Sequence, residues 1–182
     1  MSRAYVVKAS LKDVAPEIWR RLQVPADISL QKLHQVLQVA FGWNNYHLYL
    51  FDVAGTHYSD PDSELDLEIE DTARVTFRSV APWVGSSFSY IYDFGDDWQH
   101  QIVLEQVLEV DDPQGPAFFC LGGERACPPE DCGGVPGYEE ILKALRAGKG
   151  KGYQETRRWV GKDFDPDLFD REAINAGLRL LA

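Results

Sequence analysis

Three aspartates and one histidine lie within eight residues of one another, a pattern that could bind a metal ion or move protons. Asp93, Asp96 and Asp97 precede His100, which falls on the same strand face as Trp98. Carboxylates beside an imidazole can bind a divalent cation, or raise the histidine pKa so that it exchanges protons near neutral pH. The spacing matches neither the calcium-loop pattern nor His-Glu-x-x-His. The alternatives are a hairpin turn whose aspartates accept backbone amide hydrogen bonds while His100 packs at the core edge, and a surface that recognises a partner.

A second candidate site contains the three cysteines of the chain. Cys120, Cys127 and Cys132 are separated by six and four intervening residues in a segment rich in Pro and Gly. Three thiolates and one imidazole would complete a tetrahedral zinc site, for which His100 is the first choice of fourth ligand and His47 the second. Paired Cys-x-x-Cys knuckles are absent. Free structural cysteines and redox or disulfide chemistry therefore remain the alternatives to zinc.

Two further carboxylates, Glu130 and Asp131, directly follow Pro128-Pro129. The proline pair stiffens the loop, which would hold these carboxylates in place for a ligand or would simply lower loop entropy. A composite site requires this loop and the aspartate-rich turn to be neighbours in the folded chain. The candidate functional surface is then Asp93, Asp96, Asp97, Trp98, His100, Glu130 and Asp131.

Basic residues are concentrated in one segment of an otherwise acidic chain. Lys+Arg number 18 and Asp+Glu 29, a net charge of −11, yet residues 143–162 hold seven basic residues and one acidic residue. The overall charge repels phosphate backbones, so any phosphate contact is expected in this segment. The alternative is a solvated linker and helix face. The candidate phosphate contacts are Lys149, Lys151, Arg157 and Arg158.

Composition limits the class of protein. A chain of 182 residues with 45% hydrophobic content can bury the core of one domain. No apolar run approaches the roughly 18 residues of a membrane span, the first residues lack the core of a secretory signal, and an odd cysteine number fits reduced thiols. We therefore expect a cytoplasmic protein without a membrane partner.

The patterning predicts the elements that must position these residues. Alternating residues 5–12 and the run 18–24 predict a hairpin, and apolar spacing over 30–41 predicts a helix that Ser29 caps and Gly42 ends. Further strands are expected at 47–51, after Gly55, and on both sides of the aspartate-rich turn. The acidic stretch 60–71 is expected to be a solvated loop.

The C-terminal third is expected to be helical. Residues 111–137 look too irregular for a regular element, 138–147 predict a helix, 149–152 a basic linker, and a last helix is expected to start at Asp165-Pro166. Strands first and helices last indicate an α+β fold. We expect one compact domain over 1–182 with a mainly antiparallel sheet, the helix of the N-terminal half packed on it, and C-terminal helices covering one side. Its parts are strand-rich 1–110, a Cys/Pro/Gly loop 111–137 and helical 138–182.

Five segments together resemble the plasmid pRiA4b ORF-3-like family, whose members are also called insertion-element passenger TnpR proteins. The segments are residues 16–21 (PEIWRR), 33–43 with 47–49 (LHQVLQVAFGW, HLY), 92–100 (YDFGDDWQH), 126–134 with 136–138 (ACPPEDCGG, PGY) and 163–166 (DFDP). The resemblance extends from about residue 5 to about residue 178. It implies a plasmid or mobile-element context and leaves the activity open.

The TnpR label would imply a serine resolvase, which needs a Tyr-x-Arg-x-Ser arrangement with a nucleophilic Ser and an Arg for the phosphoryl charge. Here Val7 and Ala9 follow Tyr5 at those two positions, and no basic helix-turn-helix segment follows the last expected helix. The residues therefore argue against recombination, and they contain no complete catalytic set.

Three functions remain open. Many aromatic residues and no complete catalytic set favour a non-catalytic adaptor that recognises a protein partner. A metal-dependent hydrolase or nucleic-acid-processing accessory would use the aspartate-rich turn and the cysteine loop. A DNA-binding regulator would use 143–162.

Overall fold

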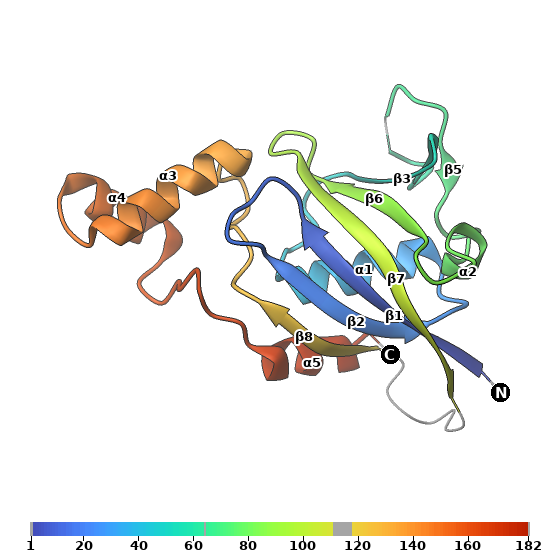
Figure 1. Ribbon diagram of the computed structural model, residues 1–182. Coiled ribbons are helices and arrows are strands. Elements are labelled where there is room, and N and C mark those ends of the chain that lie inside the picture. The colour runs from blue at the N-terminus through green and yellow to red at the C-terminus, as the bar shows by residue number, and fades with distance from the viewer. Residues whose placement is uncertain (1, 64, 111–117, 182) are drawn as a thin grey trace.

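The strands form one sheet with a nearly uniform direction of pairing. The computed structural model describes residues 2–63, 65–110 and 118–181, and the strand order is β5-β4-β3-β6-β7-β1-β2-β8 (Figure 1). Every neighbouring pair is antiparallel except β4 and β5. The strands are β1 (Ser2–Leu11), β2 (Trp19–Pro25), β3 (Tyr49–Val53), β4 (Thr56–Ser59), β5 (Glu70–Asp71), β6 (Ser87–Tyr92), β7 (Trp98–Val110) and β8 (Phe119–Glu124).

The first hairpin and the first long helix confirm the prediction. β1 pairs with β2, and α1 spans Leu30–Phe41. The Ser29 hydroxyl accepts a hydrogen bond from the Lys32 amide at the start, and Gly42 ends the helix with φ 86°. These caps satisfy backbone groups that a helix end leaves without partners.

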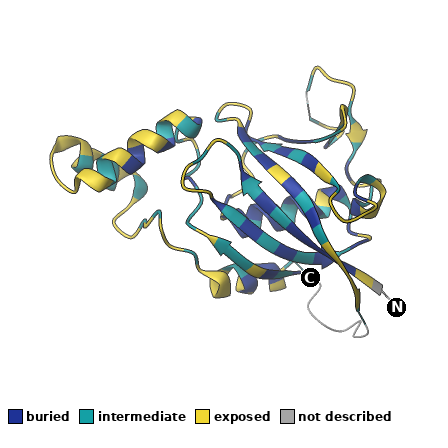
Figure 2. Cartoon of the chain, viewed as in Figure 1, coloured by how far each residue is buried: buried dark blue, intermediate teal, exposed yellow. Residues whose placement is uncertain are grey.

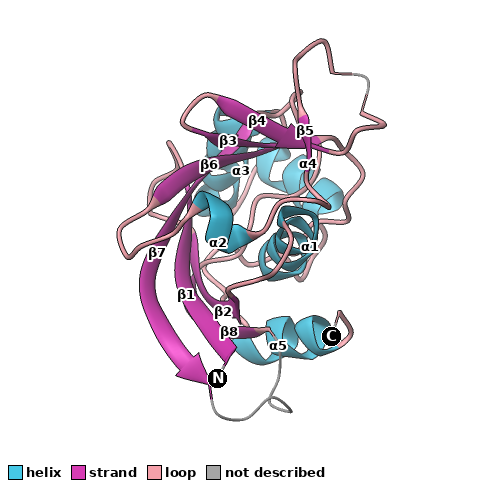
Figure 3. Cartoon of the chain, turned by 90° about the vertical axis from the view of Figure 1, so that its right-hand side faces the viewer, coloured by secondary structure: helices cyan, strands magenta, loops and turns pink. Residues whose placement is uncertain are grey.

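Helices cover one face of the curved sheet. In Figure 3 the strands bend around α1, with α5 (Arg171–Arg179) lying below it and the short α2 (Phe77–Val80) at one side. Leu33, Val36 and Leu37 of α1 are fully buried, and alternate residues of β7 such as Ile102 and Leu104 face them in the core. The other sheet face alternates toward solvent (Figure 2), as expected for an antiparallel sheet covered on one side.

The segment 111–137 contains one regular strand, so the expectation of an irregular loop is wrong there. β8 pairs with β2, and Asn175 of α5 closes its other edge. The Asn175 side chain accepts a hydrogen bond from the Cys120 amide at 2.7 Å and donates one to the Cys120 carbonyl oxygen at 3.0 Å. A helix side chain thus satisfies backbone groups that an edge strand leaves unpaired. Residues 111–117 lie outside the described part of the chain.

The C-terminal helices differ from the prediction in three places. α3 spans Gly134–Ala147 and so starts four residues before the expected 138. A separate helix α4, Lys151–Val160, was not predicted, and its first two residues fall in the expected linker 149–152. α5 starts after Asp170, whose carboxylate accepts a hydrogen bond from the Ala173 amide, five residues later than expected. The expected cap Asp165 instead accepts a hydrogen bond from the Asp167 amide. Asp165 therefore closes a local turn.

The overall class is α+β in a single compact domain, as predicted. Strands occupy the N-terminal two-thirds, and helices α3, α4 and α5 follow the last strand. Among the described residues, no helix is long and apolar enough to cross a membrane.

Candidate metal centre

The aspartate-rich turn and the cysteine loop are neighbours in the folded chain, as the composite site requires. Asp96 lies in the turn between β6 and β7. Its carboxylate accepts hydrogen bonds from the Cys132 amide at 2.9 Å and the Gly133 amide at 3.1 Å. The Asp96 carboxylate therefore connects the turn between β6 and β7 to the loop just before α3, two segments more than 30 residues apart in the chain.

Beside this junction, one histidine faces three carboxylates. The Nε2 atom of His47 lies 3.1 Å from Asp131 Oδ1, 3.6 Å from Asp93 Oδ2 and 3.9 Å from Glu130 Oε2. This Nε2 is buried and makes no hydrogen bond with the described residues. A neutral imidazole would direct its lone pair or its N–H at these oxygens, and a bound cation would neutralise their mutual repulsion.

Three of these side chains already have metal-binding geometry. One ligand atom each from His47, Asp93 and Asp131 lies within 4.8 Å of the other two. In that group Asp93 is buried, His47 is partly buried and Asp131 is exposed, so the group opens to solvent on one side. We call these three residues with Glu130 the carboxylate–histidine cluster.

Strand pairing places two members of the cluster. Tyr49 of β3 pairs with Tyr92 of β6, and the Asp93 amide donates to the Leu48 carbonyl oxygen at 2.9 Å. Since β3 and β6 are antiparallel, the residue just before β3 meets the residue just after β6. Leu48 therefore meets Asp93, and His47, the residue before Leu48, brings its Nε2 to 3.6 Å from Asp93 Oδ2. The Asp93 Oδ1 atom accepts the Gly95 amide at 2.9 Å, which leaves Oδ2 facing the histidine.

The proline loop supplies the other two members. Pro128 accepts a hydrogen bond from the Trp43 indole at 3.1 Å, and Glu130 Oε1 accepts the Asn44 amide at 2.7 Å. The Tyr92 hydroxyl also donates to Glu130, at 3.2 Å. Burial, with the Glu130 charge beside it, raises the pKa of Tyr92, so the phenol keeps its proton and remains a donor. Glu130 is thus fixed, while Asp131 lies at the solvent side.

The cysteines and His100 do not gather into the expected zinc set. Within the described residues, the only group of three or more potential ligands with converging atoms is the one that contains His47. Cys120 lies on β8, where its backbone amide donates a hydrogen bond to Asn175 of α5. Burial raises the pKa of Cys127, and burial with the charge of Asp96 raises that of Cys132 to about 12. Burial thus disfavours the thiolate form in which cysteine binds zinc.

Three residues of the predicted functional surface face elsewhere. Trp98 and His100 are fully buried, and the His100 ring contacts Phe41 and Trp43 edge-on. Burial lowers the pKa of His100 to about 3, so it is neutral at physiological pH. Asp97 accepts a hydrogen bond from the Gln99 amide group at 2.9 Å. His100 therefore belongs to the core.

The candidate phosphate contacts lie far from the cluster along the chain, around α4. Lys149 precedes α4, and Lys151 pairs with Glu155 at 3.6 Å. Arg157 donates to the Phe164 carbonyl oxygen at 2.6 Å, and Arg158 is exposed.

The sequence prediction therefore found Asp93, Glu130 and Asp131 but ranked His47 only as a second-choice zinc ligand. The signal that could have placed His47 is the strand register, because it stands two residues before the β3 residue that pairs with the last residue of β6.

Comparison with known proteins places the chain among relatives without an assigned function. The curated protein y4hQ of Sinorhizobium fredii, described as uncharacterized, is 38% identical over 178 residues, which cover 97% of this chain and 91% of y4hQ. The crystal structure of MM3350, a protein of unknown function from Methanosarcina mazei Go1, matches with a TM-score of 0.85 and 32% identity over 95% of this chain and 97% of that one. The family model of the plasmid pRiA4b ORF-3-like protein matches residues 3–173. The chain belongs to the plasmid pRiA4b ORF-3-like family.

Proposed function

We propose that the carboxylate–histidine cluster binds a divalent cation and that the protein is a metal-dependent hydrolase. The observation that carries this proposal is the buried Nε2 of His47, which makes no hydrogen bond among the described residues while oxygens of Asp93, Glu130 and Asp131 face it at 3.1–3.9 Å. Three carboxylates repel one another at this spacing, and a bound cation between them would relieve that repulsion.

The donor set favours Mn²⁺ over the alternatives. Carboxylate oxygens suit Mg²⁺ and Mn²⁺, whereas an imidazole nitrogen suits transition metals, so one histidine with carboxylates fits Mn²⁺ with Zn²⁺ as its competitor. Metal–ligand bonds of about 2.0–2.2 Å require ligand atoms roughly 3 Å apart. Ligand atoms within 4.8 Å of one another reach that spacing through small side-chain rotations.

The arrangement leaves room for water on the metal. Three or four protein ligands do not fill the coordination sphere, and Asp131 lies at the solvent side with 70% of its side chain exposed. A bound divalent cation lowers the pKa of its water toward about 7. A cation held there by His47, Asp93 and Asp131 would supply a polarised water, and Glu130, whose Oε2 lies 3.9 Å from His47 Nε2, would be placed to accept a proton from it and return that proton to the leaving group.

A cleft beside the cluster indicates the class of substrate. It encloses about 210 Å³ and shares His47 with the cluster, and Asn45, Ser59, Asp60 and Asp62 contribute polar walls. Hydroxyl and amide groups in such a cleft fix the orientation of a ligand. Asp60 and Asp62 repel anions, so the cleft favours an ester or amide that is neutral or cationic.

Mn²⁺ titration of chelator-stripped protein tests this proposal. We expect one equivalent to bind, and His47→Ala to weaken the affinity by about 30-fold or more because it removes a direct ligand. The matched control is His57→Ala, since the His57 side chain is 30% exposed and lies 3.9 Å from Asp52, close to the 29% exposure of His47. We expect the control to bind like wild type. Equal losses in both variants, or no binding by wild type, would sink the proposal.

A second candidate function, recognition of a protein partner, is favoured by apolar side chains around the cluster. Tyr46, Leu48 and Phe94, each adjacent to a cluster residue in sequence, are 74%, 43% and 41% exposed. Exposed aromatic side chains are typical of interface centres. If the cluster is only a docking site, Tyr46→Ser with Phe94→Ser will abolish capture of partners from native lysate while the Mn²⁺ affinity stays unchanged. Metal-dependent turnover of model esters that survives this double change would favour the hydrolase instead.

A further inference from the structure

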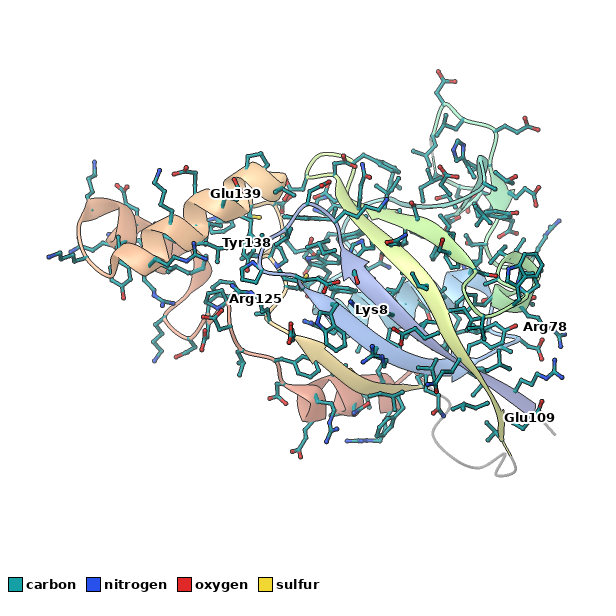
Figure 4. All side chains as sticks on the ribbon, viewed as in Figure 1. Lys8, Arg78, Glu109, Arg125, Tyr138 and Glu139 are labelled. Atoms are coloured by element: carbon teal, nitrogen blue, oxygen red, sulfur yellow. The ribbon has the colours of Figure 1, made fainter. Side chains whose placement is uncertain are left out.

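The α3–α4 hairpin extends away from the sheet and contributes little to the core (Figure 1). Near its base, Tyr138 and Leu142 of α3 are buried and belong to the core cluster, and Figure 4 labels Tyr138 at this junction. No residue of α4 is buried, and Figure 2 shows its surface as largely exposed. Packing of the core therefore does not explain the residues of α4.

The α3–α4 hairpin and the residues just after it carry basic side chains, several of which have no partner in the described part of the fold. Residues 143–162 have a net charge of +6 in a chain whose total is −11. Four of the seven basic side chains make no hydrogen bond or ion pair with any described residue. These four are Arg146, Lys149, Arg158 and Lys162.

The other three basic side chains have partners within the segment or close to it. Lys143 pairs with Glu140 at 3.4 Å, and Lys151 with Glu155 at 3.6 Å. Arg157 donates to a backbone carbonyl oxygen at 2.6 Å. The four unpaired charges are therefore the ones available to an external anion.

The α3–α4 hairpin extends away from the sheet, so its outer end is separated from the acidic residues in the rest of the protein (Figure 1). A helix of 14 residues such as α3 is about 21 Å long, whereas charges in water are screened beyond about 8 Å at physiological ionic strength. An anion at the outer end of the hairpin, where Arg146 and Lys149 lie at the end of α3 and just before α4, experiences mainly the local positive charge. The net charge of the whole chain therefore does not decide binding there.

An exposed indole is the next residue in the chain after one of the unpaired charges. Trp159 is 53% exposed and directly follows Arg158 on α4. Stacking of a base on an exposed aromatic ring is favourable and tolerant of sequence, and basic side chains beside the ring bind the backbone phosphates. The bases of a duplex are already stacked, so this combination fits a single strand.

We propose that the α3–α4 hairpin binds single-stranded nucleic acid. Arg146, Lys149, Arg158 and Lys162 contact the phosphates, and a base stacks on Trp159. The surface is distinct from the carboxylate–histidine cluster and does not require the metal.

Fluorescence anisotropy with a labelled 20-nucleotide oligothymidine tests this proposal. Wild type binds it at about 50 mM salt, and the affinity falls as salt rises. Replacing the four unpaired basic residues by Ala weakens binding about 30-fold or more and lowers the slope of log K against log salt by about 3, because each phosphate contact on a single strand contributes roughly 0.7.

The control changes the charge by the same amount elsewhere. Arg3, Arg74, Arg171 and Arg179 are exposed and lie outside the hairpin, and their replacement by Ala leaves the affinity within about threefold of wild type if local contacts matter. Trp159→Ala weakens binding about 10-fold and leaves the salt slope unchanged, since stacking releases no counterions.

Several outcomes overturn the proposal. They are no wild-type binding at the lowest salt, equal losses in the two fourfold variants, and binding only to vesicles that contain an anionic lipid. Dimerisation of wild type that the hairpin variant loses, without any binding of oligothymidine, would assign the surface to a second copy of the chain and likewise overturn it.

Discussion

Arg20→Met is expected to lower the free energy of unfolding by about 4 kcal/mol, because it removes the donor of a buried network and leaves the acceptors behind. Arg20 is 3% exposed. Its guanidinium donates to the carbonyl oxygens of Ala40, Trp19, Glu124 and Arg125 at 2.8–2.9 Å. These oxygens come from the end of α1, from β2, and from the end of β8 with the residue that follows it.

No carboxylate neutralises this cation among the ion pairs of the described residues. The charge is stabilised by carbonyl dipoles and by the ring faces of Phe41 and Phe169, whose centroids lie 5.2 and 5.1 Å away. Burial lowers the pKa of Arg20, in agreement with a desolvated charge. Methionine has similar length but donates no hydrogen bond, so four carbonyl oxygens, one at a buried bond and three at partly buried bonds, lose this donor.

Arg21→Met is the matched control for this prediction. Arg21 is the next residue on β2 and pairs with Glu105 at 2.6 Å, with 38% of its side chain exposed. An exposed pair contributes less than about 1 kcal/mol, so the control should be close to wild type. Urea unfolding followed by circular dichroism measures both variants. A loss below about 1 kcal/mol for Arg20→Met would show that the network does not stabilise the fold.

Arg20 also shows where sequence reasoning reaches its limit. The alternation along β2 puts Arg20 on the same face as Leu22 and Val24, and all three are buried. A pattern alone cannot separate a buried arginine from an exposed one. The difference is made by carbonyl acceptors that lie about 100 residues later in the chain, at Glu124 and Arg125.

Elements with a strong local signal were predictable. α1 carries an apolar stripe over three turns, a serine cap and a terminal glycine, and its bounds match the expectation. α4 shares only the terminal glycine, Gly161, because it buries no residue and starts after Gly150, which has no side chain to cap it. β8 contains Gly122 and Gly123, which weaken strand propensity, and it depends on β2 and Asn175 for its pairing.

The candidate site was also predictable only in part: the sequence indicated its acidic residues but not how they converge. Acidic residues in a turn and after a proline pair pointed to Asp93, Glu130 and Asp131. Their convergence on His47 depends on strand register and on Asp96, which holds the proline loop against the turn. Long-range pairing of this kind is not visible in residue types or spacing.

Gly137→Ala should reduce both the free energy of unfolding, by about 3 kcal/mol, and the proposed Mn²⁺ affinity. An alanine Cβ at this position would lie 1.8 Å from the carbonyl oxygen of Cys132 and 2.8 Å from its carbonyl carbon. Both obstacles are backbone atoms, so no side-chain rotation relieves the overlap. The first turn of α3 or the proline loop must shift, and Glu130 and Asp131 shift with the loop.

Gly152→Ala adds the same methyl group where it meets nothing within 4 Å, in the first turn of α4. It should raise stability by about 0.5–1 kcal/mol, because alanine favours a helix over glycine. Gly137 lies close to the backbone of Cys132, and this contact could stabilise the fold, position the metal ligands, or do both. Urea unfolding and Mn²⁺ titration of both variants measure these two effects separately. If Gly137→Ala loses stability but keeps the metal affinity of wild type, the loop does not position the ligands. A loss of both would mean that the close contact between α3 and the loop is what holds Asp131 in reach of His47.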